Sequence, residues 1–210
     1  MMYLPRKVQL SHILFTFFIA ILHYAQGRVE PVSKSVFYDK KDGLDLAGLG
    51  IRKKGPVNVY SVALYAAKAP CMKDCNSCDK SKIATKVSQG NYAKEIVLKM
   101  SRTVGAEKMA IAISDAVAPR MKGKDAIVLN QLKQAMTTGL SGGCKKGTLL
   151  SFKTPSKHRM IFSIDGKTQA DLNSDALVSA FLNTYVDNKC VSPTLKADLC
   201  TTICKWLGRD

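Results

Sequence analysis

Arg52 and Tyr60 are the two residues whose types and spacing could hold an anion. They lie on either side of the Gly55-Pro56 turn in the stretch LAGLGIRKKGPVNVYSVALYA, residues 46–66. A guanidinium offers several N–H donors in a fixed plane and a phenol adds one O–H donor, so the pair suits a carboxylate or carbonyl oxygen in an apolar pocket. On pattern alone, the alternative is a solvated loop arginine and an ordinary core tyrosine.

Two strands joined by a basic turn must position this pair. Residues 57–66 follow a β pattern, and successive side chains on a strand point to opposite faces. The alternation puts Asn58, Tyr60, Val62 and Leu64 on one face and Val59, Ser61, Ala63 and Tyr65 on the other. We therefore expect Val62 and Leu64 to lie in the cleft beside Tyr60.

The other reactive residue types do not form a recognisable catalytic set. His12 and His23 fall in the N-terminal segment, which leaves His158 alone in a predicted hairpin turn at the surface. The chain has no G-x-S-x-G elbow and no P-loop, and Gly48 and Gly50 lack the third glycine and the following helix of a dinucleotide fingerprint. We expect no catalytic residue of these classes and no cofactor.

Residues 1–27 are typical of a secretory signal peptide. Arg6 and Lys7 form the charged region, residues 13–22 the apolar core, and residues 25–27 a small-residue cleavage site. The apolar run is shorter than the roughly 18 to 20 residues that a membrane span needs. We expect a single domain over residues 28–210, secreted or in the endomembrane lumen, with onward routing to a plastid left open.

The chain is strongly basic. Residues 1–27 contain Arg6 and Lys7 and no acid, so their removal lowers the net charge from +16 to +14. A basic surface permits peripheral contact with an anionic membrane. The lysines are scattered, without the arginine-rich or aromatic-interleaved motifs of nucleic-acid readers, so we expect no nucleic-acid partner. The oligomeric state is not indicated.

All seven cysteines follow residue 27. In an oxidising compartment this predicts disulfides, and the odd number leaves at least one cysteine free, capped or paired between chains. Cys71, Cys75 and Cys78 resemble half of a zinc knuckle, but no fourth ligand lies at knuckle spacing, so we expect no metal site. Cys200 and Cys204 lie one helical turn apart, which favours two separate partners over a mutual bond.

The hydrophobic patterns predict an α+β domain with an antiparallel β-sheet packed against a layer of α-helices. Three strands come first, then two helices, a hairpin and two more helices. Residues 68–90 are predicted to be a surface loop pinned by a disulfide. The other expected elements are an edge strand at 36–38, a third strand at 92–102, helices at 105–119 and from the N-cap Asp125 to Met136, a hairpin over 148–166 turning at Thr154-Pro155-Ser156, and helices capped by Ser174 and Ser192.

Four segments resemble the chalcone isomerase superfamily in the same order and with similar spacing. They are AGLGIRKKGPVNVYSVALYA, VLKMSRTVGAEKM, GTLLSFKTPSKHRMIFSIDG and LVSAFLNTYVDNKCVSPTLKADL. The most specific motifs are Gly-x-Gly-x-Arg before a strand ending in Leu-Tyr, and the Val-Ser-Pro that opens the last helix. The resemblance covers residues 36–207 without the loop at 68–90. It implies a large antiparallel sheet backed by helices, with a ligand cleft between them.

The superfamily divides into isomerases, which close a chalcone to a flavanone, and non-catalytic relatives that resemble fatty-acid-binding proteins. The shared arginine falls on Arg52, and Tyr60 stands where the isomerases carry a threonine and the fatty-acid-binding branch a tyrosine. An isomerase tyrosine and asparagine align with Lys108 and Asp115, and a late threonine falls near Lys167. The resemblance therefore implies the non-catalytic branch, with Arg52 and Tyr60 as the ligand-binding pair. Lys108 and Asp115 are further candidates for the cleft.

These observations lead to three hypotheses. The first is a non-catalytic protein that binds a fatty acid or similar small apolar carboxylate, clamped by Arg52 and Tyr60. The second is an intramolecular lyase or isomerase acting on a phenolic or enone ligand, with Lys108 or Asp115 recruited as an acid or base. The third is a disulfide-stabilised extracellular interaction protein that keeps the fold without a ligand.

Overall fold

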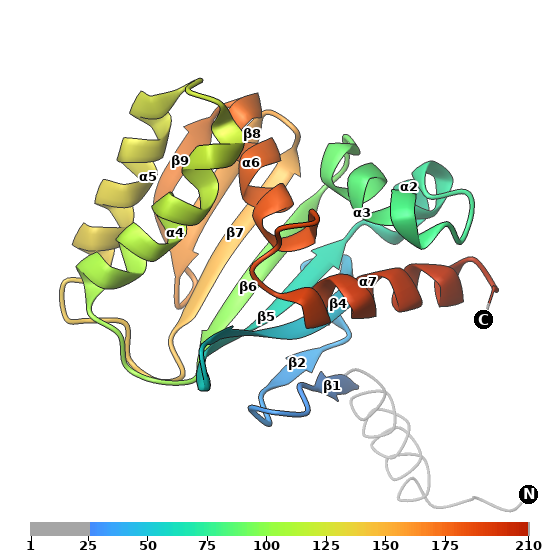
Figure 1. The fold of residues 1–210 in the computed structure, drawn as a ribbon, viewed down its shortest axis with the longest axis horizontal. Coiled ribbons are helices and arrows are strands. Elements are labelled where there is room, and N and C mark those ends of the chain that lie inside the picture. Colours follow the sequence, from blue (N-terminus) through green and yellow to red (C-terminus); the bar gives the residue numbers. More distant parts are fainter. Residues whose placement is uncertain (1–25, 210) are drawn as a thin grey trace, which may run out of the picture.

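The computed structural model describes residues 26–209 (Figure 1). Its main feature is a seven-stranded sheet in which every strand pairs antiparallel with its neighbour in the chain. The strands are β3 (Lys40–Lys41), β4 (Leu44–Lys54), β5 (Val57–Ala66), β6 (Lys94–Met100), β7 (Leu149–Ser156), β8 (Arg159–Ile164) and β9 (Lys167–Asn173). The predicted signal peptide lies outside the described residues, apart from Gln26 and Gly27.

Helices cover one face of the sheet, which confirms the predicted α+β architecture (Figure 1). They are α2 (Lys68–Asp74), α3 (Lys80–Gln89), α4 (Ala106–Met121), α5 (Ala126–Gly139), α6 (Asp175–Val186) and α7 (Pro193–Trp206). Helices α4, α5 and α6 lie over the β7–β9 half, and α7 runs along β4. None of the helices in residues 26–209 is both long enough and apolar enough to cross a membrane.

The sheet has an apolar core on each face. The larger one fills the space between the sheet and the helices and includes Val62 and Leu64. The smaller one, around Phe37 and Tyr65, lies on the opposite face. The predicted edge strand at 36–38 forms, but as β2 (Val36–Tyr38) it pairs with β1 (Gly27–Val29) and not with the main sheet.

Gly50 allows α7 to lie directly on β4. A Cβ atom at this position would approach the backbone nitrogen of Leu195 to 2.3 Å. As predicted, Ser192 caps α7, since its hydroxyl accepts a hydrogen bond from the Leu195 N–H. The same hydroxyl donates to the Ile51 carbonyl at 2.9 Å. The glycine therefore serves close packing between the last helix and the strand that carries Arg52.

A β-bulge changes the predicted side-chain alternation at the start of β5. Arg52 pairs with Tyr60 and Lys53 pairs with Asn58, so Val59 is an extra residue on its strand. A bulge re-aims the side chains next to it. Val59 consequently lines the same cavity as Tyr60, although the simple period-two pattern assigned it to the opposite face.

Residues 68–90 form α2 and α3, so the prediction of a surface loop was wrong. Asp79 caps α3 by accepting a hydrogen bond from the Ser81 N–H, and Ile83 and Val87 are buried one turn apart. Lysines and cysteines are frequent across residues 68–90. So many polar residues suggested a loop, but α3 needs only a few apolar residues to form its buried stripe.

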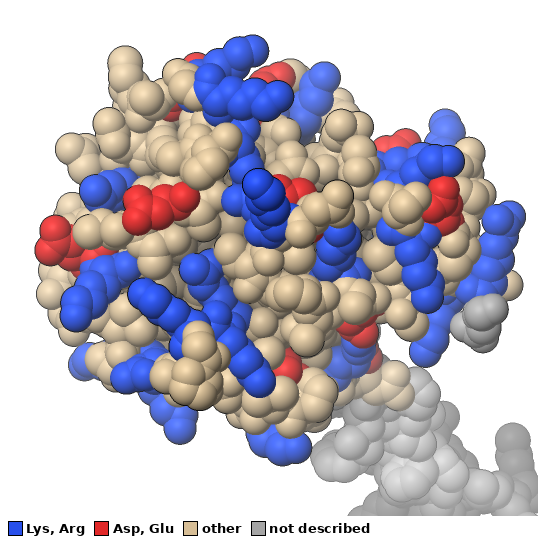
Figure 2. Space-filling view, viewed as in Figure 1, with Lys and Arg blue, Asp and Glu red and all other residues tan. Residues whose placement is uncertain are grey.

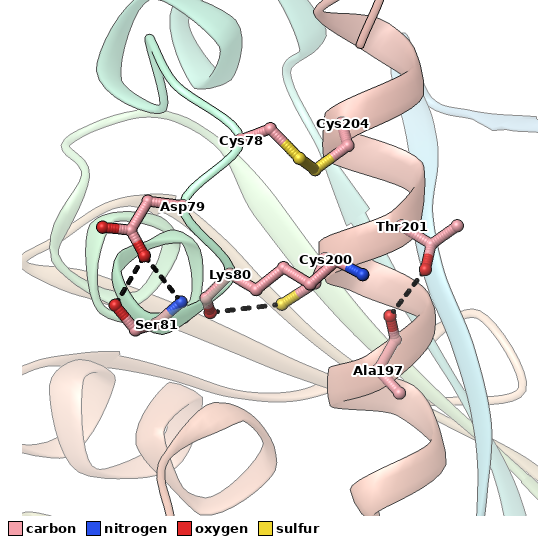
Figure 3. The surroundings of a disulfide bond; sticks show 8 residues. All are labelled: Cys78, Asp79, Lys80, Ser81, Ala197, Cys200, Thr201 and Cys204. Atoms are coloured by element: carbon pink, nitrogen blue, oxygen red, sulfur yellow. Dashed lines mark hydrogen bonds between the residues drawn. A yellow bond between two sulfur atoms is a disulfide. The ribbon is translucent and has the colours of Figure 1, made fainter. Parts of the chain in front are cut away.

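One disulfide pins this region, in line with the prediction. The bond between Cys78 and Cys204 joins the α2–α3 linker to α7 (Figure 3). Cys200 makes no bond with Cys204, as expected, but it has no disulfide of its own and contacts the Lys80 carbonyl. The cysteines present as thiols are Cys71, Cys75, Cys144, Cys190 and Cys200. Among residues 26–209, no group of three or more His, Cys, Asp or Glu is placed to hold a metal ion.

Two further differences concern the second half of the sheet. Strand β9 was not predicted because it is a polar edge strand in which only Leu172 is buried. The β7–β8 turn was predicted at residues 154–156, but these residues extend β7 through a register irregularity. Ser156 then pairs with Arg159, so the chain turns at Lys157 and His158 instead.

The boundary between α4 and α5 also differs from the prediction. Helix α4 continues through Pro119 to Met121. Asp125 precedes α5 as expected, but it has a left-handed backbone with φ of 51° and its side chain does not cap the helix. Its carboxylate accepts a hydrogen bond from the Ser174 hydroxyl instead. A long-range contact therefore replaces the local cap.

Candidate functional site

A cavity of about 730 Å³ lies between the tip of the β4–β5 hairpin, the segment after β6 and the first half of α4. Its walls are mainly apolar and include Val59, Val104, Met109 and Ile113. A cavity of this volume is in the usual range for small-molecule sites. The charged residues on its lining are Arg52, Lys54, Arg102, Lys108 and Asp115.

Arg52 and Tyr60 meet at this cavity because they are paired residues on adjacent strands. The guanidinium carbon of Arg52 lies 5.9 Å from the centre of the Tyr60 ring. Tyr60 is 2% exposed, whereas Arg52 is partly exposed. A cation over an aromatic face is attracted by the ring, which holds the guanidinium beside the phenol.

The Tyr60 hydroxyl lies 3.2 Å from the hydroxyl of Tyr185 on α6. Burial raises the pKa of both phenols, so both are neutral donors near pH 7. One contact uses only one of the two hydroxyl protons. Either hydroxyl can be the donor in this contact. Only Tyr60 lines the cavity, so the arrangement in which Tyr185 donates leaves the Tyr60 proton for a ligand there.

The cavity arginines differ from three others in their ionic partners. Arg28, Arg120 and Arg159 each form an ion pair with an aspartate. Arg52 and Arg102 form no ion pair with the described acids, and the lining contains a single carboxylate. Their donors are therefore available to an anion from solution.

Comparison with known proteins identifies the family. Residues 32–200 match the family model described as chalcone isomerase-like. The chain belongs to the chalcone isomerase-like family. Solved structures agree: 38 chains match, among them the crystal structure of a fatty-acid binding protein from Arabidopsis thaliana. That match has a TM-score of 0.72 and 17% identity, and it covers 85% of this chain and 98% of the other. The comparison with curated proteins found no match.

The chalcone isomerase-like fold places the other predicted cleft residues in two different environments. Lys108 and Asp115 line the cavity from α4, and both are exposed. Val62 and Leu64 share the face of Tyr60, as expected, but neither has any exposed surface and neither lines the cavity. The bulge at Val59 brings that residue to the wall, while Val62 and Leu64 pack in the core.

Two more residues of this chalcone isomerase-like protein lie away from the cavity. His158 is exposed at the β7–β8 turn, as predicted, and contacts Asp175. Lys167, the loosely aligned late position, begins β9 at the far edge of the sheet. Neither belongs to the lining, so the loose alignment at Lys167 finds no support in the geometry.

The sequence reasoning missed Lys54, Arg102 and Tyr185. Lys54 lies two residues after Arg52 and Arg102 ends the predicted third strand, and only their position around a shared cavity gives them significance. Tyr185 belongs to the helix predicted after Ser174, and its ring packs on Phe181. Its hydroxyl contact joins residues 125 positions apart, so no local pattern could reveal it.

Proposed function

We propose that this protein is a non-catalytic binder of a fatty acid or a similar small apolar carboxylate. The carboxylate would lie at Arg52 and Tyr60, and the acyl chain would lie along Val59, Met109 and Ile113. The observation that carries the proposal is the meeting of an unpaired guanidinium and a buried phenol at one apolar cavity. The fold that the chain shares with a fatty-acid binding protein also supports it.

The two parts of such a ligand make different energetic demands. An acyl chain gains about 0.8 kcal/mol for each CH₂ removed from water, and part of this is offset by lost motion on binding. The head group must recover the hydration that it loses at the cavity. A guanidinium fork and a phenol O–H supply charge-assisted and neutral hydrogen bonds for this purpose.

Dodecanoate binding to the purified protein tests the proposal. Isothermal titration calorimetry should show saturable binding, and Arg52→Gln should raise the Kd about 100-fold, because a hydrogen-bonded charge is lost. Arg209→Gln is the matched control. It removes the same charge from an exposed residue beyond α7 that does not line the cavity. Equal affinities of the two variants would refute the clamp.

Lys108 and Asp115 support a second candidate function, that of an intramolecular lyase. Both line the cavity and neither forms an ion pair among the described residues, so either could contact a phenolic or enone ligand. Incubation with a chalcone, followed by absorbance, tests this function. Turnover above the solution rate that disappears in Lys108→Gln would favour the lyase, and the solution rate alone would dismiss it.

The third hypothesis, a family member without a ligand site, requires a cavity filled by side chains. The cavity of about 730 Å³ is the opposite of that arrangement. For the location of the protein, we propose the secretory route, either outside the cell or in the endomembrane lumen. The Cys78–Cys204 disulfide supports this proposal because such bonds persist in oxidising compartments. The proposed location also includes peripheral contact with an anionic membrane.

A further inference from the structure

The cavity carries more positive charge than one carboxylate needs. Four cations line it, namely Arg52, Lys54, Arg102 and Lys108, against the single acid Asp115. None of the four forms an ion pair with an acid in residues 26–209, whereas three arginines elsewhere are paired. A fatty acid brings one negative charge. Most of this positive charge would remain uncompensated with such a ligand bound.

The four cations converge from three separate parts of the fold. Arg52 and Lys54 come from the end of β4, Arg102 from the segment after β6, and Lys108 from the first turn of α4. In Figure 2, blue side chains gather between the start of α4 and the tip of the β4–β5 hairpin, with little red among them. The cluster therefore encircles a hollow and is not a run along one solvated helix face.

Two kinds of uncharged donor add to the cations. Gly105 lines the cavity and precedes α4, and no side chain caps this helix. The N–H groups of its first turn are therefore open to an acceptor, and the helix dipole favours an anion there. Tyr60 contributes a hydroxyl that is almost completely buried, with its proton free when Tyr185 donates to it.

From this arrangement we infer that the preferred ligand is a single-chain lipid with a phosphomonoester head. The inference rests on the proposed function, since it places the same acyl chain in the same cavity. A phosphomonoester carries close to two negative charges near neutral pH and three acceptor oxygens. It can engage an arginine fork, an ammonium group and the Tyr60 hydroxyl together. A carboxylate has one charge and two oxygens, and so engages fewer of them.

Three ligands with the same acyl or alkyl chain separate the effect of head-group charge from the effect of head-group shape. Dodecyl phosphate, dodecyl sulfate and dodecanoate are titrated into the protein below their micelle concentrations, at pH 8 and pH 5. The sulfate is tetrahedral, like the phosphate, but keeps one charge at both pH values. The second pKa of a phosphate is about 6, so only the phosphate changes charge. At pH 8 dodecyl phosphate should bind at least tenfold more tightly than either analogue, and its advantage over the sulfate should fall below threefold at pH 5.

The charged groups that face the head are Arg52 and Lys54 from β4, Arg102, and Lys108 and Asp115 from α4. Dividing the phosphate affinity by the sulfate affinity at each pH cancels changes in the protein that affect both ligands. The Arg102→Gln/Lys108→Gln variant should lose the phosphate preference, because its affinity for dodecyl phosphate should fall at least tenfold more than its affinity for dodecyl sulfate. Arg52→Gln should weaken all three ligands.

The outcomes separate this inference from the proposed function. Arg52-dependent dodecanoate binding without a phosphate preference would overturn the inference and leave the proposed function intact. Binding of dodecyl phosphate without binding of dodecanoate would overturn the proposed function and leave the phosphomonoester head intact. Inorganic phosphate is the last arm: if it displaced dodecyl phosphate at similar concentrations, the site would recognise phosphate without a lipid, and the inference would fail. Failure of all three lipids to bind would overturn both.

Discussion

The two ends of the β5–β6 strand pair each hold a cation beside a tyrosine. At one end, the Arg52 guanidinium lies 5.9 Å from the Tyr60 ring centre and faces the cavity. At the other end, the Lys94 amine lies 4.0 Å from the Tyr92 ring centre. Lys94 is 1% exposed and donates to the carbonyls of Gly90 and Tyr92 at 2.6 and 3.0 Å. The pairs are similar in composition and opposite in accessibility.

The difference shows how to tell a structural cation from a binding one. The amine of Lys94 is occupied by carbonyl oxygens, one of them at the C-terminus of α3, where a cation is favoured. Helices α2 and α3 cover this closed end, and the Cys78–Cys204 disulfide holds their linker on α7. At the open end, Arg52 forms no ion pair with a carboxylate of residues 26–209. The closed end thus stabilises the fold, and the open end is available to a ligand.

Removing the disulfide is the strongest way to test this separation. The cysteines of the bond are 126 residues apart, so its loss should lower the free energy of unfolding by about 5 kcal/mol in the chain-entropy account. Urea unfolding of the Cys78→Ala/Cys204→Ala variant measures this. The other five cysteines are thiols in the structure, so reductant should destabilise the wild type and leave the variant unchanged.

Ligand binding provides the second half of this test. Cys190→Ser, which alters a partly exposed thiol outside the disulfide, is the matched control for stability. The dodecanoate affinity of the folded disulfide variant should stay within threefold of the wild type. A larger change would show that the closed end shapes the open end, and the comparison between them would no longer hold.

The same contrast explains what could be predicted from the sequence. The Arg52–Tyr60 pairing follows from a short hairpin, because a turn at Gly55-Pro56 brings residues on its two sides onto neighbouring strands. The antiparallel sheet and its helical layer follow from hydrophobic periods that are local. The resemblance to the chalcone isomerase superfamily adds the order of the elements, and the family match over residues 32–200 confirms it.

The features that escaped prediction depend on packing between distant segments. The Cys78–Cys204 partnership and the Tyr60–Tyr185 contact each join residues more than a hundred positions apart. Helix α3 has a narrow apolar stripe among lysines, which a local period does not distinguish from a loop. The bulge at Val59 needs the register of two strands, so alternation alone misassigned that residue.

Titration of the closed end gives a second prediction, of moderate size. Burial lowers the pKa of Lys94 from 10.5 to about 8, so the unfolded chain holds this proton to higher pH than the folded protein does. The resulting penalty on the folded state is present below pH 8 and is relieved as the pH rises towards 10.5. Relative to Lys94→Met, the wild-type free energy of unfolding should therefore increase by about 2 kcal/mol between pH 7.5 and 9.5.

Subtracting the Lys94→Met profile removes the contributions of neighbouring groups. Cys71 interacts electrostatically with Lys94, so both profiles are measured in a Cys71→Ser background. Urea unfolding at several pH values provides the measurement. Parallel profiles for the wild type and the variant would mean that Lys94 keeps an ordinary pKa. Dodecanoate affinity should not depend on this substitution, because the amine is enclosed at the end remote from the cavity.

The smallest expected effect concerns the Tyr185 hydroxyl, which acts on the open end without touching a ligand. Tyr185→Phe keeps the ring that packs on Phe181 and removes only the hydrogen bond to Tyr60. Dodecanoate affinity should fall about fivefold, on the order of 1 kcal/mol, because Tyr60 loses the donor that directs its proton to the cavity. If Tyr185 had a purely structural role, Tyr185→Phe would lower dodecanoate affinity equally in the wild type and in a Tyr60→Phe background. A positioning role acts through that hydroxyl, so Tyr185→Phe should have no effect on affinity in a Tyr60→Phe background.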